Sequence, residues 1–362
     1  MKAEEISFAP QRKLVWWRFR KHKLAVVGLV VIGLLYLMAA FAEFLSPSVP
    51  GEVKATYAQA PPRLVHVSFG DGPFLYVDGY KSTVDTLQQR RVFETDESQR
   101  IALRLFARGE PYRMWGLIPS DRHLLGPVDK DAPVFLLGAD RSGRDLLTRI
   151  VYGARISLSV GLVGVLLSFV LGMFIGGLSG YLGGTVDLVI QRVIEFIISI
   201  PTLPLWLGLA AAIPRTWDPL KVYVAIVVVL SLIGWTGMAR VMRSRFLQIR
   251  GEDYVLAAEL DGASRLRVVG RHMLPAFTSH IIASLTLTVP GMILGETALS
   301  FLGLGLQPPT VSWGVLLKEA QSVQALATTP WLLAAGAAVV VTVVALNFVG
   351  DGLRDAADPY EN

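Results

Sequence analysis

The sequence contains no cysteine, which excludes disulfides, thiolate metal sites and thiol catalysis. Charge is also scarce: Asp, Glu, Lys and Arg make up 17% of the 362 residues, against about 25% in a typical soluble domain. The charge is missing from long blocks, which indicates a membrane protein rather than a large soluble core. No Gly-Lys dipeptide occurs, so the chain has no Walker A loop for ATP, and no His-Glu-x-x-His pair is present. We therefore expect no catalytic residue, metal site or cofactor in this chain.

Six apolar blocks are each long enough to cross a hydrocarbon core, which takes about 20 helical residues. Lipid offers no partners for backbone hydrogen bonds, so each block is expected to be a helix. The fold predicted is an all-α polytopic membrane protein with six transmembrane helices. The blocks are Leu24–Leu45, Ile156–Leu182, Val193–Ile213, Val222–Ala239, Ile281–Leu306 and Trp331–Gly350.

The first block can also be interpreted as a signal peptide. It follows basic residues, and Ala40-Phe41-Ala42 has the small-x-small pattern of a cleavage site. However, the polar tail before it has about 23 residues and the apolar run is longer than a signal core. We expect a retained membrane anchor.

Lys and Arg beside the spans predict the orientation, because they stay on the cytoplasmic side. One group lies before the first span and a second lies between the fourth and fifth, and six spans place both groups on the same side. Both termini are then cytoplasmic. These clusters also account for the net charge of +5 without a nucleic-acid partner. The groups are Arg12, Lys13, Arg18, Arg20, Lys21 and Lys23, and Arg240, Arg243, Arg245, Arg250, Arg265, Arg267 and Arg271.

About 110 residues, Ser46–Arg155, separate the first two spans and are expected to lie outside. Two β-prone runs, Val65–Phe69 and Phe74–Val77, flank a Gly-rich turn and predict a hairpin. The charged segment Thr86–Gly109 is interpreted as helical. The insert is therefore predicted to be a small external α+β module, with a disordered linker as the alternative. Its aromatic residues favour docking of another protein; they include Tyr76, Tyr80 and Trp115.

The cytoplasmic segment after the fourth span predicts a compact helix–turn knob. Tyr254–Leu260 can form a short helix with Asp253 as its N-cap, and Ala257 and Ala258 keep one side of it thin. Gly262 suits a C-terminal turn with positive φ. Ser264 can cap a second helix that would stop near Leu274-Pro275. The alternative is an ordinary interhelical loop.

This segment resembles the EAA loop of binding-protein-dependent ABC importer permeases, in which Glu-Ala-Ala is followed by Gly and then Ile-x-Leu-Pro. Leu256-Ala257-Ala258, Gly262 and His272-Met273-Leu274-Pro275 stand at that spacing. Leu256 replaces the glutamate and His272 the isoleucine. Further segments, in order, resemble the C-type dipeptide and oligopeptide permeases: Leu137–Asp145 with Tyr152–Leu158, Ser300–Gly305 with Pro308-Pro309 and Ser312–Gly314, and Gly350–Asp355 with Asp358-Pro359. The end of the insert, Gly116–Leu124, is similar to the subgroup with an enlarged external loop that includes Yej-type importers.

The resemblance implies a type I ABC importer permease that imports di- or oligopeptides or peptide-like solutes. Its implied partners are a homologous second permease, two cytoplasmic ATPase subunits that bind ATP and Mg²⁺, an external solute-binding protein, and the lipid of a bacterial inner membrane. The EAA loop, residues 250–275, would couple the ATPases to the helices. The residues that match the coupling element are Ala257, Ala258, Glu259, Asp261, Gly262, Ala263, Ser264, Leu274 and Pro275.

Polar residues inside spans are costly unless they meet a partner or a wet cavity. The acids Glu195 and Glu296 stand inside the predicted spans, and Pro201 and Pro204 interrupt the helix that carries Glu195. These groups are candidates for the translocation path, and structural hydrogen bonds at a subunit interface are the alternative. The candidates are Glu195, Ser199, Thr202, Glu296, Thr297 and Ser300.

Gly172, Gly176 and Gly180 recur at four-residue spacing in the second span and predict close helix packing.

The predicted divisions of the chain are a cytoplasmic tail (1–23), the first span (24–45), the external insert (46–137), a permease core with five spans (138–352) and a cytoplasmic tail (353–362). Two alternatives remain. One is the same importer class for nickel chelates or oligosaccharides. The other is an ion-coupled secondary transporter, although no internal repeat is seen.

Overall fold

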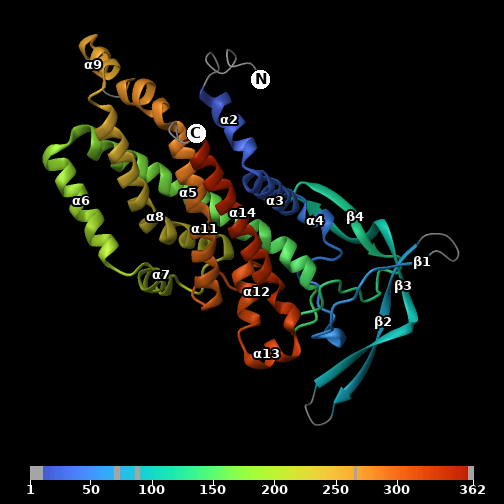
Figure 1. The fold of residues 1–362 in the computed structure, drawn as a ribbon. Coiled ribbons are helices and arrows are strands. Elements are labelled where there is room, and N and C mark those ends of the chain that lie inside the picture. The colour runs from blue at the N-terminus through green and yellow to red at the C-terminus, as the bar shows by residue number, and fades with distance from the viewer. Residues whose placement is uncertain (1–10, 69–73, 86–89, 265–266, 358–362) are drawn as a thin grey trace. The chain divides into compact units, whose positions relative to one another are not determined.

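The computed structural model describes residues 11–68, 74–85, 90–264 and 267–357 (Figure 1). The chain forms two compact units. The first unit comprises residues 1–33, 159–296 and 341–362, and the second comprises residues 34–158 and 297–340. Four long helices are divided between the two units, so that one part of each helix belongs to each unit.

Within the described residues, five helices are long and apolar enough to cross a membrane, and a bent pair makes up to six. The pair consists of α6 (Gly184–Ser199) and α7 (Thr202–Ala211), which meet at 85°. Ile200 between them is extended, as expected for a residue before proline. The five are α3 (Lys23–Ala40), α5 (Leu146–Leu182), α8 (Pro219–Ile249), the run Val268–Phe301 that ends in α11 (Thr278–Phe301), and Pro330–Ala357, which contains α14 (Ala334–Ala357).

The predicted count of six therefore holds when the bent pair is taken as one span. The predicted interruption of the helix over Val193–Ile213 is confirmed at Pro201, where the chain turns between α6 and α7. Proline lacks the N–H that an unbroken helix needs.

In the first unit, the glycines of α5 pack against α8 as the sequence predicted. A Cβ on Gly172 would lie 2.6 Å from Cβ of Met238, and one on Gly180 would lie 2.7 Å from the carbonyl oxygen of Arg243. Such distances leave no room for a side chain. The glycine face therefore sets how closely these two helices approach.

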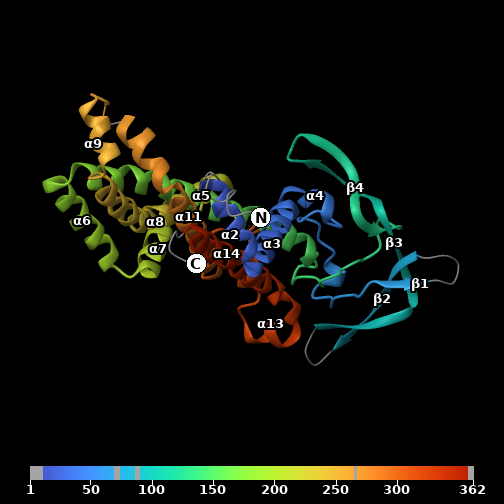
Figure 2. The same ribbon diagram turned by 45° about the horizontal axis from the view of Figure 1, so that its top comes forward.

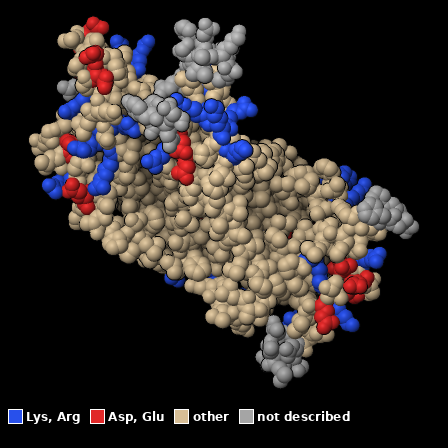
Figure 3. Space-filling model, viewed as in Figure 1, with Lys and Arg blue, Asp and Glu red and all other residues tan. Residues whose placement is uncertain are grey.

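The N-terminal helix α2 (Gln11–Lys21) and the end of α14 meet in the first unit. Phe19 and Ala25 form a buried cluster with Val349 and Ala356. Helix α9 (Asp253–Leu260) lies at the same end of this unit as α2, and Lys and Arg side chains gather around both (Figures 1 and 3). The two basic segments that the sequence places on one side of the membrane thus lie at the same end of this unit.

The second unit contains an antiparallel sheet with the order β1-β2-β3-β4. The strands are β1 (His66–Ser68), β2 (Phe74–Asp85), β3 (Arg90–Met114) and β4 (Ile118–Pro127) (Figures 1 and 2). The predicted hairpin is confirmed, since His66 pairs with Tyr76 and Ser68 with Phe74.

The predicted helix over Thr86–Gly109 is wrong: its described residues from Arg90 onward belong to β3. The part of β3 up to Leu103 pairs with β2, and the part from Leu103 onward pairs with β4. Leu103 and Val77 are buried in the sheet's core cluster. These distant contacts override the local charge pattern that suggested a helix. Between residues 46 and 137, the described helical structure is one 3₁₀ turn, Ala55–Tyr57.

An aromatic core holds the insert together. Tyr80 packs with Tyr57, Phe93 and Phe135. Its hydroxyl donates to the carbonyl oxygen of Pro61 at 2.8 Å. Burial raises the pKa of the Tyr80 phenol. Tyr80 is therefore partly buried against this core and offers less surface for docking than a fully exposed ring would.

Candidate functional site

The segment predicted to form a knob folds as α9 followed by a turn. The predicted helix is confirmed. The predicted cap is wrong: Glu252 occupies the N-cap without a side-chain hydrogen bond, and Asp253 is the first helical residue. An acid in the first turn still stabilises the helix, because that end carries partial positive charge.

Gly262 forms the turn after α9 with φ at +78°, as the sequence predicted. Its N–H donates to the carbonyl of Glu259 at 3.0 Å, and the next N–H, from Ala263, donates to Ala258 at 3.1 Å. A Cβ at Gly262 would meet no heavy atom within 4 Å. Glycine is thus required here by backbone conformation and not by lack of space.

One face of α9 is buried in the first unit. Val255 and Ala258, three residues apart, enter a cluster with Met242, Phe246 and Phe277. These partners come from α8 and from the turn η3 (Leu274–Phe277) that leads into α11. The cluster also receives Ala263 and Leu274 at its edge. The knob is therefore packed directly onto the ends of two spans.

The remaining residues of α9 are exposed, and they include large apolar side chains. Leu260 is 88% exposed, and Tyr254 and Leu256 are each more than two-fifths exposed. Ala257 and Asp261 lie on the surface beside them. Leu256, which replaces the glutamate of the resembled pattern, thus adds to an apolar surface. Ser264 and Pro275 are also exposed.

Glu259 ties the knob to a third span. The Tyr181 hydroxyl, near the end of α5, donates to Oε1 of Glu259 at 2.8 Å. Sequence reasoning named Glu259 but missed Tyr181, because the two residues are 78 positions apart. The spacing of the motif gave no signal for this contact.

The second helix of the knob differs from the prediction. Val268–Met273 is a π-helix, Leu274–Phe277 is a 3₁₀ turn, and α11 follows directly. The π-helix ends at Met273, as the predicted stop near Leu274-Pro275 requires. The chain then continues directly in a new helical segment, and Pro275 sits in its first turn, where its missing N–H costs little. The carbonyl of Ser264 accepts from Val268 N at 3.0 Å.

Three of the six translocation-path candidates lie on α6 and α7 in the first unit. Glu195 is exposed and pairs with Arg192 at 2.7 Å, one helical turn earlier. The Ser199 hydroxyl donates to the carbonyl of Phe196 at 2.7 Å, and Thr202 is exposed. These three residues lie at or near the break between α6 and α7, and their side chains are exposed.

The other three candidates are buried. Glu296 is fully buried in the first unit. In the second unit, Thr297 is buried and Oγ of Ser300 accepts from Leu306 N at 3.0 Å. Ser300 thereby closes the turn after α11. This geometry favours a structural role for Ser300 within the chain.

The Leu137–Asp145 motif builds a buried ionic cluster in the second unit. Asp140 has no exposed surface and accepts from the backbone N–H groups of Ser142 and Arg144, at 2.7 and 3.0 Å. It also pairs with the guanidinium groups of Arg144 and Arg149. Arg149 reaches Glu319 of α12 (Trp313–Glu319) at 2.8 Å. In the sequence this motif was recognised only by its resemblance to the permease family, which assigned no role to its residues.

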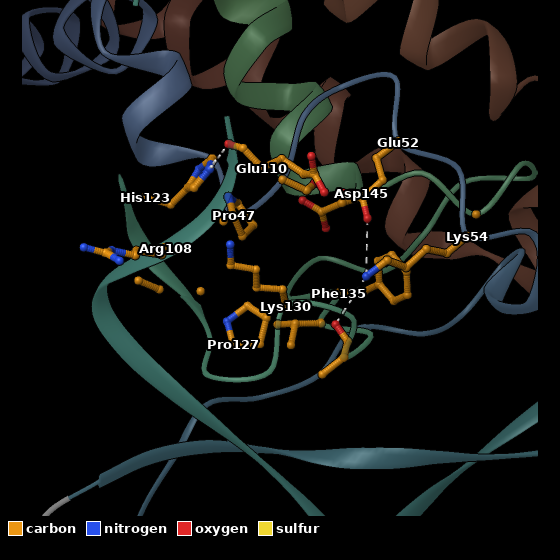
Figure 4. A pocket seen from close by; sticks show the side chains of 17 residues that line it. Pro47, Glu52, Lys54, Arg108, Glu110, His123, Pro127, Lys130, Phe135 and Asp145 are labelled. Carbon is orange, nitrogen blue, oxygen red and sulfur yellow. Dashed lines mark hydrogen bonds and ion pairs between the residues drawn. The ribbon is translucent and has the colours of Figure 1, made fainter. Parts of the chain in front are cut away.

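A small cavity of about 40 Å³ lies beside this cluster (Figure 4). Asp145 lines it, together with Glu52, Lys54 and Lys130. Asp145 caps α5, since its Oδ2 accepts from Thr148 N at 2.7 Å. Its Oδ1 has no hydrogen-bond partner among the described residues. Burial raises the pKa of Asp145 to about 6, and the charge of Glu52 adds to the rise.

We expect the stability of the second unit to depend on pH through Asp145. Its pKa is higher in the folded chain than the ordinary value of 3.8, so its favourable contribution is complete below about pH 4. That contribution is lost as the pH rises through about 6, and the linkage amounts to about 3 kcal/mol. Asp145→Asn keeps a capping oxygen and should be more stable than wild type at pH 7, but not at pH 4. Thermal unfolding of both proteins from pH 4 to 7 measures this; parallel curves would contradict it.

Two family models match parts of this sequence. Residues 168–360 match the family described as binding-protein-dependent transport system inner membrane component. Residues 11–62 match the N-terminal TM domain of oligopeptide transport permease C, which includes α3 and favours an anchor over a cleaved signal.

Curated relatives match over nearly the whole chain. The dipeptide transport system permease protein DppC of Bacillus subtilis is 32% identical over 95% of this chain and 84% of its own length. The oligopeptide transport system permease protein OppC of the same organism is 30% identical over 99% of this chain and 93% of its own length. Among solved structures, the MetNI methionine ABC transporter in an inward-facing conformation has a TM-score of 0.47 at 20% identity. The structural match covers 58% of this chain and 97% of the chain in that structure.

Proposed function

The chain belongs to the family of binding-protein-dependent transport system inner membrane components, and from this premise we propose that it is one of two permease subunits of an ATP-driven peptide importer. It is a transporter permease and not a catalytic enzyme. Two ATPase partners are proposed to bind ATP and Mg²⁺ at the cytoplasmic side. A binding protein is proposed to deliver solute from outside.

The observation that carries the proposal is the two-sided character of α9. One face is packed onto α8 and the start of α11 through Val255 and Ala258. The other presents Leu256 and Leu260 to solvent. Exposed apolar side chains on a short helix mark a site where another protein binds. The exposed face of α9 is therefore proposed to be the ATPase contact.

The packing explains how movement at α9 can reach the membrane helices. Phe246 of α8 and Phe277 before α11 are in ring contact, with centroids 5.6 Å apart, beneath the knob. The Tyr181–Glu259 hydrogen bond joins α5 to the same knob. Closely packed interiors transmit displacement instead of absorbing it. Closure of the ATPases on ATP would thus move α5, α8 and α11 together and switch the path between inward- and outward-facing states.

Leu260→Asp is the direct test of the ATPase contact. The side chain is 88% exposed, so the substitution should leave folding intact. A buried, unpaired carboxylate at an apolar interface is expensive, and we expect ATPase binding to fall at least tenfold. The measurement is co-purification of the ATPase subunits with the tagged permease pair, followed by ATP-dependent uptake in proteoliposomes.

Val323→Asp is the matched control, because Val323 is 83% exposed and lies on α13 (Val323–Thr328), in the second unit. It should retain the ATPases. Equal retention by both variants would remove α9 as the contact. Loss by both variants would indicate a general assembly defect and would equally fail to support the proposal.

The orientation is proposed from the basic flanks. Cysteines at Lys2 and Glu361 should be protected from an impermeant thiol reagent in intact cells, whereas one at Asp96 should react. The cysteine-free chain gives no background labelling. Labelling at Lys2 from outside would reverse the orientation. Lys2 and Glu361 lie outside the described residues.

Peptides are proposed as the solute because two relatives that align over nearly the whole chain carry dipeptide or oligopeptide transport in their names. Nickel chelates and oligosaccharides remain the alternative within the importer class. ATP-dependent uptake of labelled tripeptide, in competition with either alternative, separates them. Glu195, Ser199 and Thr202 are retained as proposed path residues, since they are exposed around the α6–α7 break.

A further inference from the structure

The tip of the β3–β4 hairpin has a conformation that its sequence does not favour. Trp115 and Gly116 both have positive φ, at 53° and 75°, and Leu117 N donates to Met114 O at 3.0 Å. This is the pattern of a type I′ turn, in which Asn-Gly is preferred. A bulky residue in the left-handed region is strained and persists only where surrounding contacts hold it.

Those contacts come from the end of the α3 span, within the second unit. The Trp115 indole Nε1 donates to the carbonyl of Ala40 at 2.7 Å, the last residue of α3. Its backbone N–H donates to Oε1 of Glu43 at 3.3 Å, and its ring lies 5.8 Å from that of Phe41. The hairpin thus folds back so that its tip reaches the helix terminus (Figures 1 and 2).

Glu43 is itself held firmly at this place. Burial alone would raise the pKa of its carboxyl, but hydrogen bonds from the Arg155 guanidinium overcome this and lower the pKa. Two guanidinium nitrogens of Arg155 lie 2.7 and 2.8 Å from the carboxylate oxygens. The tip is therefore fixed to an ionised, paired group at the end of the span, and its depth relative to α3 is set.

The surface around the tip is apolar. Leu117 is 78% exposed, and Trp115 and Ile118 are each about half exposed. Leu34 and Leu37 of α3 are exposed as well, and so is Phe41, which follows the last residue of the helix. Leu34 and Leu37 are three residues apart, which puts them on one face of the helix. The ring contact between Phe41 and Trp115 joins this face to the hairpin tip.

We propose that the β3–β4 tip is a membrane anchor that enters the lipid head-group region beside α3. The occupant is lipid, because the apolar surface of the tip continues the exposed face of a membrane-spanning helix and lies at that helix's end. An indole whose N–H is bonded at a helix terminus while its ring stays apolar suits the interface between hydrocarbon and water. The exposed Arg113, next to the turn, is placed for the phosphates of lipid head groups. The inference requires only that α3 spans the membrane and not a particular solute or orientation.

The test uses the complete transporter in lipid nanodiscs, without the binding protein. A cysteine at Leu117 in the cysteine-free chain carries an environment-sensitive NBD fluorophore. Val84→Cys is the matched control, since Val84 is an apolar residue of β2 that is 65% exposed in the same sheet. We expect the label at 117 to emit at shorter wavelength and to be quenched by lipids that carry a nitroxide near the head group. The label at 84 should emit as in water and be quenched by aqueous iodide.

Two results would overturn the proposal. Water-like emission at 117, with iodide quenching equal to that at 84, would mean that the tip stands in solvent. Short-wavelength emission without nitroxide quenching would mean that another protein subunit, and not lipid, covers the tip. Trp115→Ala in the Leu117→Cys background should weaken quenching by the nitroxide lipids at least twofold, because the contact to Ala40 is lost. Unchanged quenching in this variant would show that Trp115 does not set the depth of the tip.

Discussion

Gly262→Val should reduce ATP-dependent uptake about tenfold or more while the membrane helices remain inserted. The native φ of +78° is in the left-handed region, which costs an ordinary L-residue about 1–2 kcal/mol and a β-branched residue more. A penalty of about 2 kcal/mol shifts the equilibrium of the turn by roughly 30-fold. The altered turn should misplace the exposed face of α9 and uncouple ATP hydrolysis from transport. Uptake and ATPase rate in proteoliposomes are the measurements.

Gly262→Asn separates the conformational cause from a steric one. Asparagine tolerates positive φ better than other residues, and a side chain at this position meets no heavy atom within 4 Å. The Asn variant should therefore transport at more than half of the wild-type rate. Equal uptake by Gly262→Val and by the wild type would exclude the turn from coupling. An equal loss of uptake in Gly262→Asn and Gly262→Val would mean that the ATPases approach Gly262 itself closely.

Asp140→Ala should nearly abolish recovery of the folded permease. The substitution leaves the buried Arg149 guanidinium without its main partner and also removes the acceptor of two backbone N–H groups. Breaking a buried ion pair by removing one partner costs about 3–5 kcal/mol, a large part of a total stability of about 5–15 kcal/mol. The yield of assembled complex and its thermal midpoint are the measurements.

Asp121→Ala is the comparison, because Asp121 also pairs with arginines but does so on the surface. Its contacts to Arg108 and Arg122 are 3.8 and 4.0 Å, with about half of each side chain exposed or more. Exposed pairs contribute about 0–1 kcal/mol, so yield and midpoint should stay near wild type. An Asp140→Ala protein that behaves like Asp121→Ala would show that burial does not make the cluster essential.

Much of the candidate site could be predicted because its signals are local. The apolar residues that bury α9, the glycine that turns the chain and the following segment lie within about 25 residues of each other. Helix formation and positive φ depend on near neighbours. The positions of Val255 and Ala258 on one face follow from helical periodicity. The identity of their partners on α8 does not.

The misses share a non-local cause. β3 carries a charge pattern typical of an exposed helix, and only its pairing with β2 and β4 makes it a strand. Tyr80 was interpreted as a docking residue, and the sequence did not show that partners 13 or more positions away partly bury its ring. The N-cap was placed one residue too late, at Asp253 instead of Glu252, which is within the usual uncertainty of helix boundaries.

The amino-acid sequence by itself determined the membrane spans, the knob and the need for glycine at 262, because each depends on hydrophobic length or backbone conformation over a few residues. The tertiary structure alone decided that Asp140, Arg149 and Glu319 share a cluster and that Trp115 is fixed to Ala40 at the end of α3. These pairs are separated by 9 to 170 positions, and no periodicity in a single chain specifies which distant groups meet. Burial then fixes their partners, since an unpaired buried charge or N–H would be too costly.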